Sequence, residues 1–212
     1  MQMLVFREFA VQDDQRVYRP GPGLLATVTE QMSMRTLHTR AQPTLELLAQ
    51  LVGESVNLQV RVGTSVRVLS TVDAETTVVR VGDRRGVVLD AAAASGGVAL
   101  LSLLDADELT RLYRSPMASA LGVQMKEAEF ASFQEALRHV RITGWAVNRE
   151  RTEDGVVAIG APVRGPTGQG VAAVSISVPA TRAAVVDAKH VRAALLQACA
   201  EIERGLVDED HE

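Results

Sequence analysis

Two serines near the end of the chain, Ser175 and Ser177, have the types and spacing that most clearly suggest chemistry. Side chains alternate along a strand, so both hydroxyls point to one face while the apolar neighbours at 174, 176 and 178 point to the other. Antiparallel sheets commonly expose one face to solvent, and the same face can instead line a binding site. The two residues by themselves leave both interpretations open.

A second candidate is Ser95-Gly96-Gly97, which precedes a dense apolar run from Val98 to Leu104. We expect a buried helix that begins at these residues. Glycines at a helix start let backbone N–H groups approach a ligand, and the positive end of the helix dipole favours an anion such as a carboxylate. Glycine is also common in ordinary turns, so the pair alone does not distinguish a site from a turn.

Further candidates lie in the strands that the sequence predicts after Gly144. Asn148 ends the first of them, and its amide can both donate and accept hydrogen bonds. Val156 and Ala158 alternate on the next strand and would supply apolar walls. The three acidic residues of the intervening loop, 150–154, are expected to be solvated, because one loop does not give the paired geometry of catalytic carboxylates.

Nothing else in the sequence indicates catalysis or metal binding. Four histidines are scattered without metal-ligand spacing, and the single cysteine, Cys199, lies among apolar residues of a predicted helix, where a buried and inert thiol is expected. The chain has no nucleophile elbow, phosphate-binding loop or dinucleotide fingerprint. We therefore expect no enzyme activity, no cofactor and no metal site.

The composition sets broader limits. Of 212 residues, 47% are hydrophobic and 3% aromatic, so the core must consist of aliphatic side chains and alanine. The net charge of −4 gives no overall basic field to attract nucleic acid. No segment approaches the roughly 20 apolar residues of a membrane span, and the start lacks a signal pattern. We expect a cytoplasmic protein with no membrane partner.

The order of the predicted elements favours an α+β fold in which helices cover an antiparallel sheet. The stretch after Val56 alternates apolar and polar residues, which is the mark of a strand with one buried face. The expected helices cover 24–40, 43–53, 98–104, 105–113, 126–141 and 181–206, and the expected strands are 56–62, 66–72, 76–81, 144–148 and two more within 156–179.

The stretch from Gly144 to Pro179 resembles the effector-binding half of the IclR family of bacterial transcription regulators. It combines a Gly-Trp-Ala-Val-Asn strand, an acidic loop closed by Asp154-Gly155, an apolar strand, a Gly/Pro hairpin and a strand ending in Ser-Ile-Ser. The resemblance covers roughly Phe9 to Leu206. It implies a GAF-like domain with a curved antiparallel sheet, a small organic effector that is often a carboxylate or aromatic acid, and a homodimer or tetramer.

In that family the serine pair lies in the effector pocket, on the concave face of the sheet. The resemblance therefore implies an effector-binding site made of Ser95, Gly96, Gly97, Asn148, Val156, Ala158, Ser175 and Ser177. Val98 stands where the family usually has Lys or Arg. This departure removes a cation near the pocket and counts against a highly charged effector.

The start of the chain resembles the wing and exit segment that come after the DNA-reading helices in the same family. Phe9–Val11 and Arg16–Tyr18 are strand-like runs around a polar turn, as in a wing hairpin. Because only eight residues precede Phe9, we expect those helices to be largely absent, with Arg16 and Arg19 left as weak phosphate contacts. Either the chain is a truncated copy or the gene start lies upstream. The expected division is a wing remnant at 1–23, a linker helix at 24–40, an effector domain at 41–206 and a disordered tail at 207–212.

We accordingly expect a ligand-sensing domain of an IclR-type regulator. Effector binding would shift the population of dimer shapes, and so the spacing of attached DNA readers. The alternative is a free-standing small-molecule binding module that acts through protein contacts or mixed dimers.

Overall fold

The computed structural model describes residues 10–12, 18–20, 22–74 and 81–207, and within these ranges it describes side chains from Met34 onward. The chain forms two compact units, residues 1–39 and 40–212. The tail at 208–212 and the predicted strand at 76–81 lie outside the described residues, apart from Val81, which is not in a strand.

In the first unit, strands β1 (Ala10–Gln12) and β2 (Tyr18–Pro20) pair antiparallel, with Val11 opposite Arg19. This confirms the predicted hairpin pairing, although the second strand is described two residues later than expected. Arg16 lies outside the described residues, and so does the side chain of Arg19. Their contact with DNA phosphates stays a prediction.

Helix α2 (Pro22–Val52) is continuous where two helices were predicted, so the expected break before Pro43 was wrong. Proline lacks the N–H that would bond to the preceding turn, which usually interrupts a helix. Here the ladder continues on both sides of Pro43. The predicted stop is confirmed at Gly53, whose φ of +70° and N–H bond to the Ala49 carbonyl (2.9 Å) end the helix.

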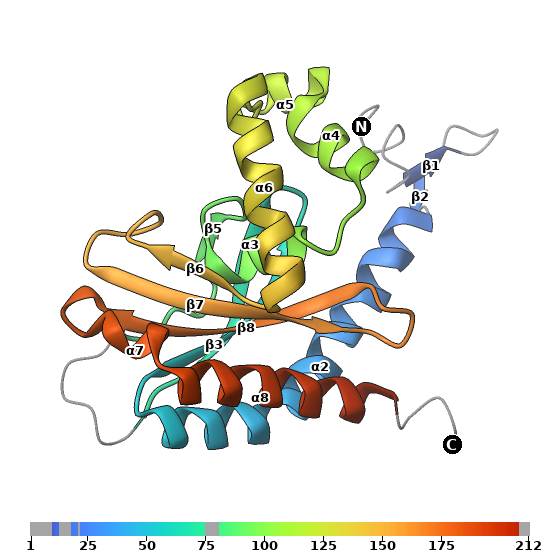
Figure 1. Ribbon diagram of the computed structural model, residues 1–212. Helices are drawn as coiled ribbons and strands as arrows, with labels where there is room; N and C mark the ends of the chain where they lie inside the picture. Colours follow the sequence, from blue (N-terminus) through green and yellow to red (C-terminus); the bar gives the residue numbers. More distant parts are fainter. Residues whose placement is uncertain (1–9, 13–17, 21, 75–80, 208–212) are drawn as a thin grey trace. The chain divides into compact units, whose positions relative to one another are not determined.

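The second unit contains an antiparallel sheet with the strand order β5-β4-β3-β8-β7-β6 (Figure 1). Each strand pairs only with antiparallel neighbours in the described residues, which agrees with the predicted α+β class. Strand β5 was not predicted, because it is very short. The strands are β3 (Ser55–Val62), β4 (Ser65–Val72), β5 (Val88–Asp90), β6 (Ala146–Arg149), β7 (Val156–Arg164) and β8 (Gly170–Pro179).

One face of this sheet is covered by α3 (Ser95–Leu101), with α6 (Glu127–Thr143) beyond it (Figure 1). Helix α4 (Ala106–Arg114) begins with the predicted capping box, in which the Glu108 N–H donates to Asp105 Oδ1 at 2.7 Å. Helix α5 (Pro116–Ala120) occupies a stretch for which no element was predicted. Helices α3, α4 and α6 and the sheet enclose a hydrophobic cluster that includes a Tyr113–Phe133 edge contact.

The opposite face is covered by α8 (Lys189–Val207), beside the part of α2 that comes after residue 40 (Figure 1). The predicted single helix over 181–206 was wrong: a 3₁₀ turn (Ala180–Arg182) and α7 (Ala184–Asp187) precede α8. The helical conformation is interrupted at Ala188, whose ψ of 129° is extended. Arg192 stabilises this interruption, because it donates to the Val186 carbonyl (3.1 Å) and to the Asp187 carboxylate (2.8 Å).

Both faces of the central strands are therefore buried. In β3, Val56 and Leu58 are fully buried on the α8 side, and Asn57 and Gln59 are also at most 4% exposed. The expectation of one solvent face for β3 was wrong, because alternation reports which residues share a face and not what covers it. No helix among the described residues is long and apolar enough to span a membrane.

Candidate ligand-binding site

The start of α3 lies against β7 without an intervening side chain. A Cβ added to Gly160 of β7 would lie 2.7 Å from the Gly96 nitrogen, closer than real contacts allow. A Cβ added to Gly97 would lie 2.4 Å from the Ala91 carbonyl oxygen. Both glycines of the predicted Ser95-Gly96-Gly97 site thus have a packing reason, and Ser95 beside them is 2% exposed.

The strand register shows which side chains share this face. One line across the sheet pairs Asn148 with Ala158, Ala158 with Ser177, and Ser177 with Ser55. The neighbouring line joins Gly160, Ser175 and Asn57. Directly opposed residues point to the same side, and Gly160 contacts α3, so both lines face α3. We call this surface the polar face and define it by Ser55, Asn57, Gln59, Thr71, Asn148, Ala158, Ser175 and Ser177.

All eight residues predicted for the effector site lie at or beside the polar face. Val156 continues the alternation of Ala158 along β7, and Ser95 to Gly97 lie over Gly160. Ser175 and Ser177 are 0% and 5% exposed, which excludes the interpretation that they form a solvent face. The structure brings these residues together, and their contact with an effector stays a prediction.

A hydrogen-bond chain crosses the polar face through residues that the sequence did not single out. Asn57 donates from Nδ2 to Ser177 Oγ (3.1 Å), and Thr71 donates from Oγ1 to Asn57 Oδ1 (2.8 Å). Thr71 Oγ1 in turn accepts from the Arg84 N–H (3.1 Å). Asn57 was detectable as a member of an alternating strand, but alternation alone predicts a solvent side for it.

Asn148 is buried and orients the β6–β7 loop. Its Nδ2 donates to Thr152 Oγ1 (2.7 Å), and its Oδ1 accepts from the Arg151 N–H (2.8 Å). Both ends of the amide are therefore used within the loop. An amide has two N–H donors and two acceptor lone pairs, so these two bonds leave capacity for a ligand.

Two buried polar atoms of the same face have no hydrogen-bond partner in the described part of the chain: Ser175 Oγ and Gln59 Oε1. Leaving such a group unpaired costs about 1–3 kcal/mol. A Cβ on Gly96 would lie 2.1 Å from Gln59 Oε1, so Gln59 also reaches the start of α3. Gln59 was not predicted as a site residue, although it shares its face with Asn57 by alternation.

An ion pair lies at the edge of this face. Arg84 Nη1 is 2.7 Å from Glu153 Oε2, and the two side chains are 9% and 52% exposed. The acidic loop was expected to be merely solvated, and for Glu153 that was incomplete. No local pattern in the sequence links these residues, since Arg84 comes after β4 and Glu153 comes after β6.

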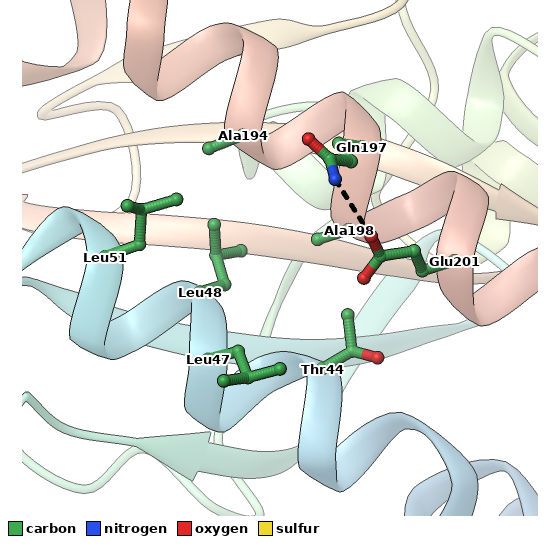
Figure 2. A pocket seen from close by; sticks show the side chains of 8 residues that line it. All are labelled: Thr44, Leu47, Leu48, Leu51, Ala194, Gln197, Ala198 and Glu201. Carbon is green, nitrogen blue, oxygen red and sulfur yellow. Dashed lines mark hydrogen bonds between the residues drawn. The ribbon is translucent and has the colours of Figure 1, made fainter.

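A different hollow lies on the other side of the sheet, between α2 and α8 (Figure 2). It has a volume of about 180 Å³ and is lined mainly by alanines and leucines. Its polar side chains bond to each other, with Gln197 Nε2 donating to Glu201 Oε1 at 3.0 Å. Leu47 and Leu51 at its rim are 64% and 72% exposed. It offers an apolar surface and no buried polar group for a ligand.

Burial raises the pKa of Cys199 to about 12, and its Sγ lies 3.7 Å from the Ala161 carbonyl oxygen, as expected for an inert thiol. Within the described residues, no cluster of His, Cys, Asp or Glu could hold a metal ion.

Trp145, just before β6, is covered by the Arg192 guanidinium at 4.3 Å from the ring centre and touched edge-on by His139.

Comparison with known proteins gives one consistent result. The family model described as bacterial transcriptional regulator IclR C-terminal matches residues 29–204. The HTH-type transcriptional regulator BhcR of Paracoccus denitrificans is 28% identical over 204 residues, which are 96% of this chain and 72% of that protein.

Solved structures show the same fold. The IclR protein of Thermotoga maritima superimposes with a TM-score of 0.68 at 22% identity, covering 97% of this chain and 83% of that one. The C-terminal domain of the Escherichia coli regulator KdgR gives 0.65 at 21% identity, covering 80% of this chain and 98% of that domain.

Proposed function

Because the chain belongs to the IclR family of bacterial transcriptional regulators, we propose that it binds a small organic effector, a carboxylate or an aromatic acid, on its polar face to control transcription. Members of the family bind small-molecule effectors, form oligomers and bind DNA. The relatives found are regulators and not enzymes, which supports a role in sensing.

The observation that carries this proposal is the Ser175 hydroxyl. It is fully buried, has no partner in the described residues, and lies beside Asn57 and Gly160 at the start of α3. A buried polar atom without a partner is costly, and a ligand bound on the polar face would complete the bonding of Ser175. Ser177 and Gln59 add polar groups, and Ala158 and Val156 add apolar walls.

The effector would act by shifting a population of shapes. The polar face joins strands β3, β4, β6, β7 and β8, so a ligand that bonds to several of them favours one curvature of the sheet. Only a difference in affinity between two shapes can move their balance. In an oligomer this balance would set the spacing of attached DNA-binding elements.

The test uses whichever ligand remains bound through native purification, identified by mass spectrometry. Replacing Ser175 and Ser177 together by Ala is expected to weaken its binding about 5- to 150-fold, from two lost hydrogen bonds of about 0.5–1.5 kcal/mol each. Ala158→Phe is expected to weaken it further by filling the site. Calorimetric titration measures both.

The matched control is Ser70→Ala. Ser70 is buried and also lacks a hydrogen-bond partner in the described residues, but it pairs with Leu58, on the α8 side of the sheet. Its substitution is expected to leave ligand affinity unchanged. An unaltered affinity in the Ser175/Ser177 double variant would remove the case for the polar face.

A second part of the proposal is self-association through the groove between α2 and α8. Exposed Leu47 and Leu51 lie beside a hollow bounded by Thr44, Ala194 and Ala198 (Figure 2). Protruding and recessed apolar groups on one surface are what a twofold contact with a second copy requires, because each patch must fit itself.

Sedimentation at micromolar concentration tests this contact. Leu47→Glu combined with Leu51→Glu is expected to shift the chain toward the monomer, because each dimer would bury four carboxylates. Ile142→Glu is the control, since Ile142 is 86% exposed on α6, away from the groove. Equal behaviour of the two variants would show that the oligomer uses another surface.

A further inference from the structure

The Arg84 guanidinium is buried but has a single ion-pair partner among the described residues. Its side chain is 9% exposed, and among the described residues only Glu153 pairs with it, through one nitrogen at 2.7 Å. A guanidinium carries several N–H donors in a planar fork that matches a carboxylate with two parallel bonds. Burial of a cation is costly unless it is paired and hydrogen-bonded, so the remaining donors have capacity for a second acceptor.

The ion pair joins the two sides of the polar face. Arg84 is fixed on the β4 side, because its N–H donates to Thr71, and Gly86 and Val87 bond to Val68. Glu153 belongs to the β6–β7 loop. Strands β3 and β8 lie between these positions in the sheet order. Thr71 bonds to Asn57, which bonds to Ser177, so Arg84 lies at the end of the polar hydrogen-bond chain.

We propose that Arg84 is the anion-binding residue of the effector site. In the absence of effector, Arg84 pairs with the Glu153 carboxylate, and a carboxylate effector displaces Glu153 when it binds. This inference rests on the effector function proposed above and names the charge that the effector must carry. It also bears on Val98, where the sequence lacks the cation usual in the family, because Arg84 would supply a cation from the segment between β4 and β5.

The unequal burial of the pair determines which partner leaves. Glu153 is half exposed and can turn into water at little cost, whereas Arg84 is enclosed and would remain. Exchange of Glu153 for a ligand carboxylate keeps the buried cation neutralised. It also frees the β6–β7 loop from the Arg84 segment, while Asn148 still holds that loop through Thr152. Ligand binding would thus be coupled to the position of one loop.

The experiment removes the internal carboxylate and offers external ones. Benzoate and acetate are titrated calorimetrically into the wild type, Glu153→Gln and the double variant Arg84→Gln/Glu153→Gln, with benzamide and acetamide as neutral probes. We expect Glu153→Gln to bind a carboxylate about 10- to 150-fold more tightly than the wild type, the range for a hydrogen bond to a charged group. The double variant should lose this gain, and the amides should not distinguish the variants.

The matched control is Asp83→Asn, which breaks the adjacent but exposed Asp83–Arg85 ion pair (2.7 Å). It should bind benzoate and acetate as the wild type does. Should the double variant not fold, Arg84→Lys/Glu153→Gln replaces it, and its point charge without a fork should keep only part of the gain.

Two results would overturn the inference: no gain in carboxylate affinity on Glu153→Gln, or a gain that persists in full without Arg84. Neither depends on the identity of the natural effector. Failure of the effector proposal would appear separately, as unchanged affinity of the co-purified ligand for the Ser175/Ser177 variant.

Discussion

In the central strands of the six-stranded sheet both faces are buried, but the side chains of the two faces differ in chemistry. On the α8 side, Val56, Ile159 and Ile176 are fully enclosed by aliphatic neighbours. On the α3 side, the adjacent residues of the same strands are Asn57, Gly160 and Ser175. Each of these strands therefore contributes apolar side chains to the α8 side and polar or small residues to the α3 side, in alternation. Burial alone therefore does not distinguish the apolar core of this fold from its buried polar face.

The largest contrast should come from neighbouring residues of β8. Ile176→Ala is expected to lower the free energy of unfolding by about 2–5 kcal/mol, because it leaves a cavity under α8. Ser175→Ala should change it by less than about 1 kcal/mol, because the hydroxyl has no partner to lose in the described part of the chain. Urea denaturation of both variants measures the difference. Similar losses would contradict the distinction between the two faces.

Gly160→Ala tests the close approach of α3. Its Cβ would lie 2.7 Å from the Gly96 nitrogen, so helix and strand must separate, at an expected cost of about 1–3 kcal/mol. Gly205→Ala on α8 is the control, because its Cβ meets nothing within 4 Å and alanine favours a helix by about 0.5–1 kcal/mol. Thermal unfolding should shift in opposite directions. A harmless Gly160→Ala would mean that the contact is not tight.

Asn57→Ala tests whether the hydrogen-bond chain of the polar face stabilises the fold. It removes the acceptor for Thr71 and the donor to Ser177, and these lost or unpaired bonds are expected to cost about 1–3 kcal/mol. Ser70→Ala, on the opposite side of the sheet, should cost less, because Ser70 Oγ has no partner in the described residues. The two unfolding free energies, measured side by side, decide whether the network stabilises the fold.

The smallest expected effect is electrostatic and lies at the α7–α8 break. The hydrogen bond from Arg149 and the nearby charge of Arg192 lower the pKa of Asp187 below its ordinary value near 3.8. A lowered pKa in the folded state stabilises above the unfolded pKa, and this stabilisation is lost as the pH falls through the folded value. Since Asp187 is half exposed, its worth is at most about 1 kcal/mol.

The comparison of wild type with Asp187→Asn checks this sign. Their difference in unfolding free energy should be constant near neutral pH and should shrink below about pH 4. A difference that grew on acidification would show that the ion pair does not stabilise the fold.

Strands β3, β4, β6, β7 and β8 and the shared face of the serines could be predicted, because alternation is local. Ser175, Ser177 and Ala158 lie on one side of the sheet as expected. The coverage of that side could not be predicted for Asn57 and Gln59, since a distant helix provides it. The binding role of the eight predicted residues stays a prediction.

The errors also have physical causes. Pro43 predicts a helix start, because a proline inside a helix loses one hydrogen bond and crowds the preceding turn, but α2 continues through it from Pro22 to Val52. Beside the interruption at Ala188, Arg149 and Arg192 both bind Asp187, and Arg149 is 38 residues from Asp187 in the chain. The Arg84–Glu153 pair also joins residues far apart in the chain, so no local sequence pattern predicts it.

The surroundings of Trp145 have a practical consequence for spectroscopy. It is the only tryptophan of the chain, and it stands immediately before the strand that carries Asn148. Because Arg192 stacks on its indole and His139 meets it edge-on, its fluorescence should respond to small movements of β6 relative to α6 and α8. The unlabelled protein thus carries an intrinsic optical probe next to its candidate site.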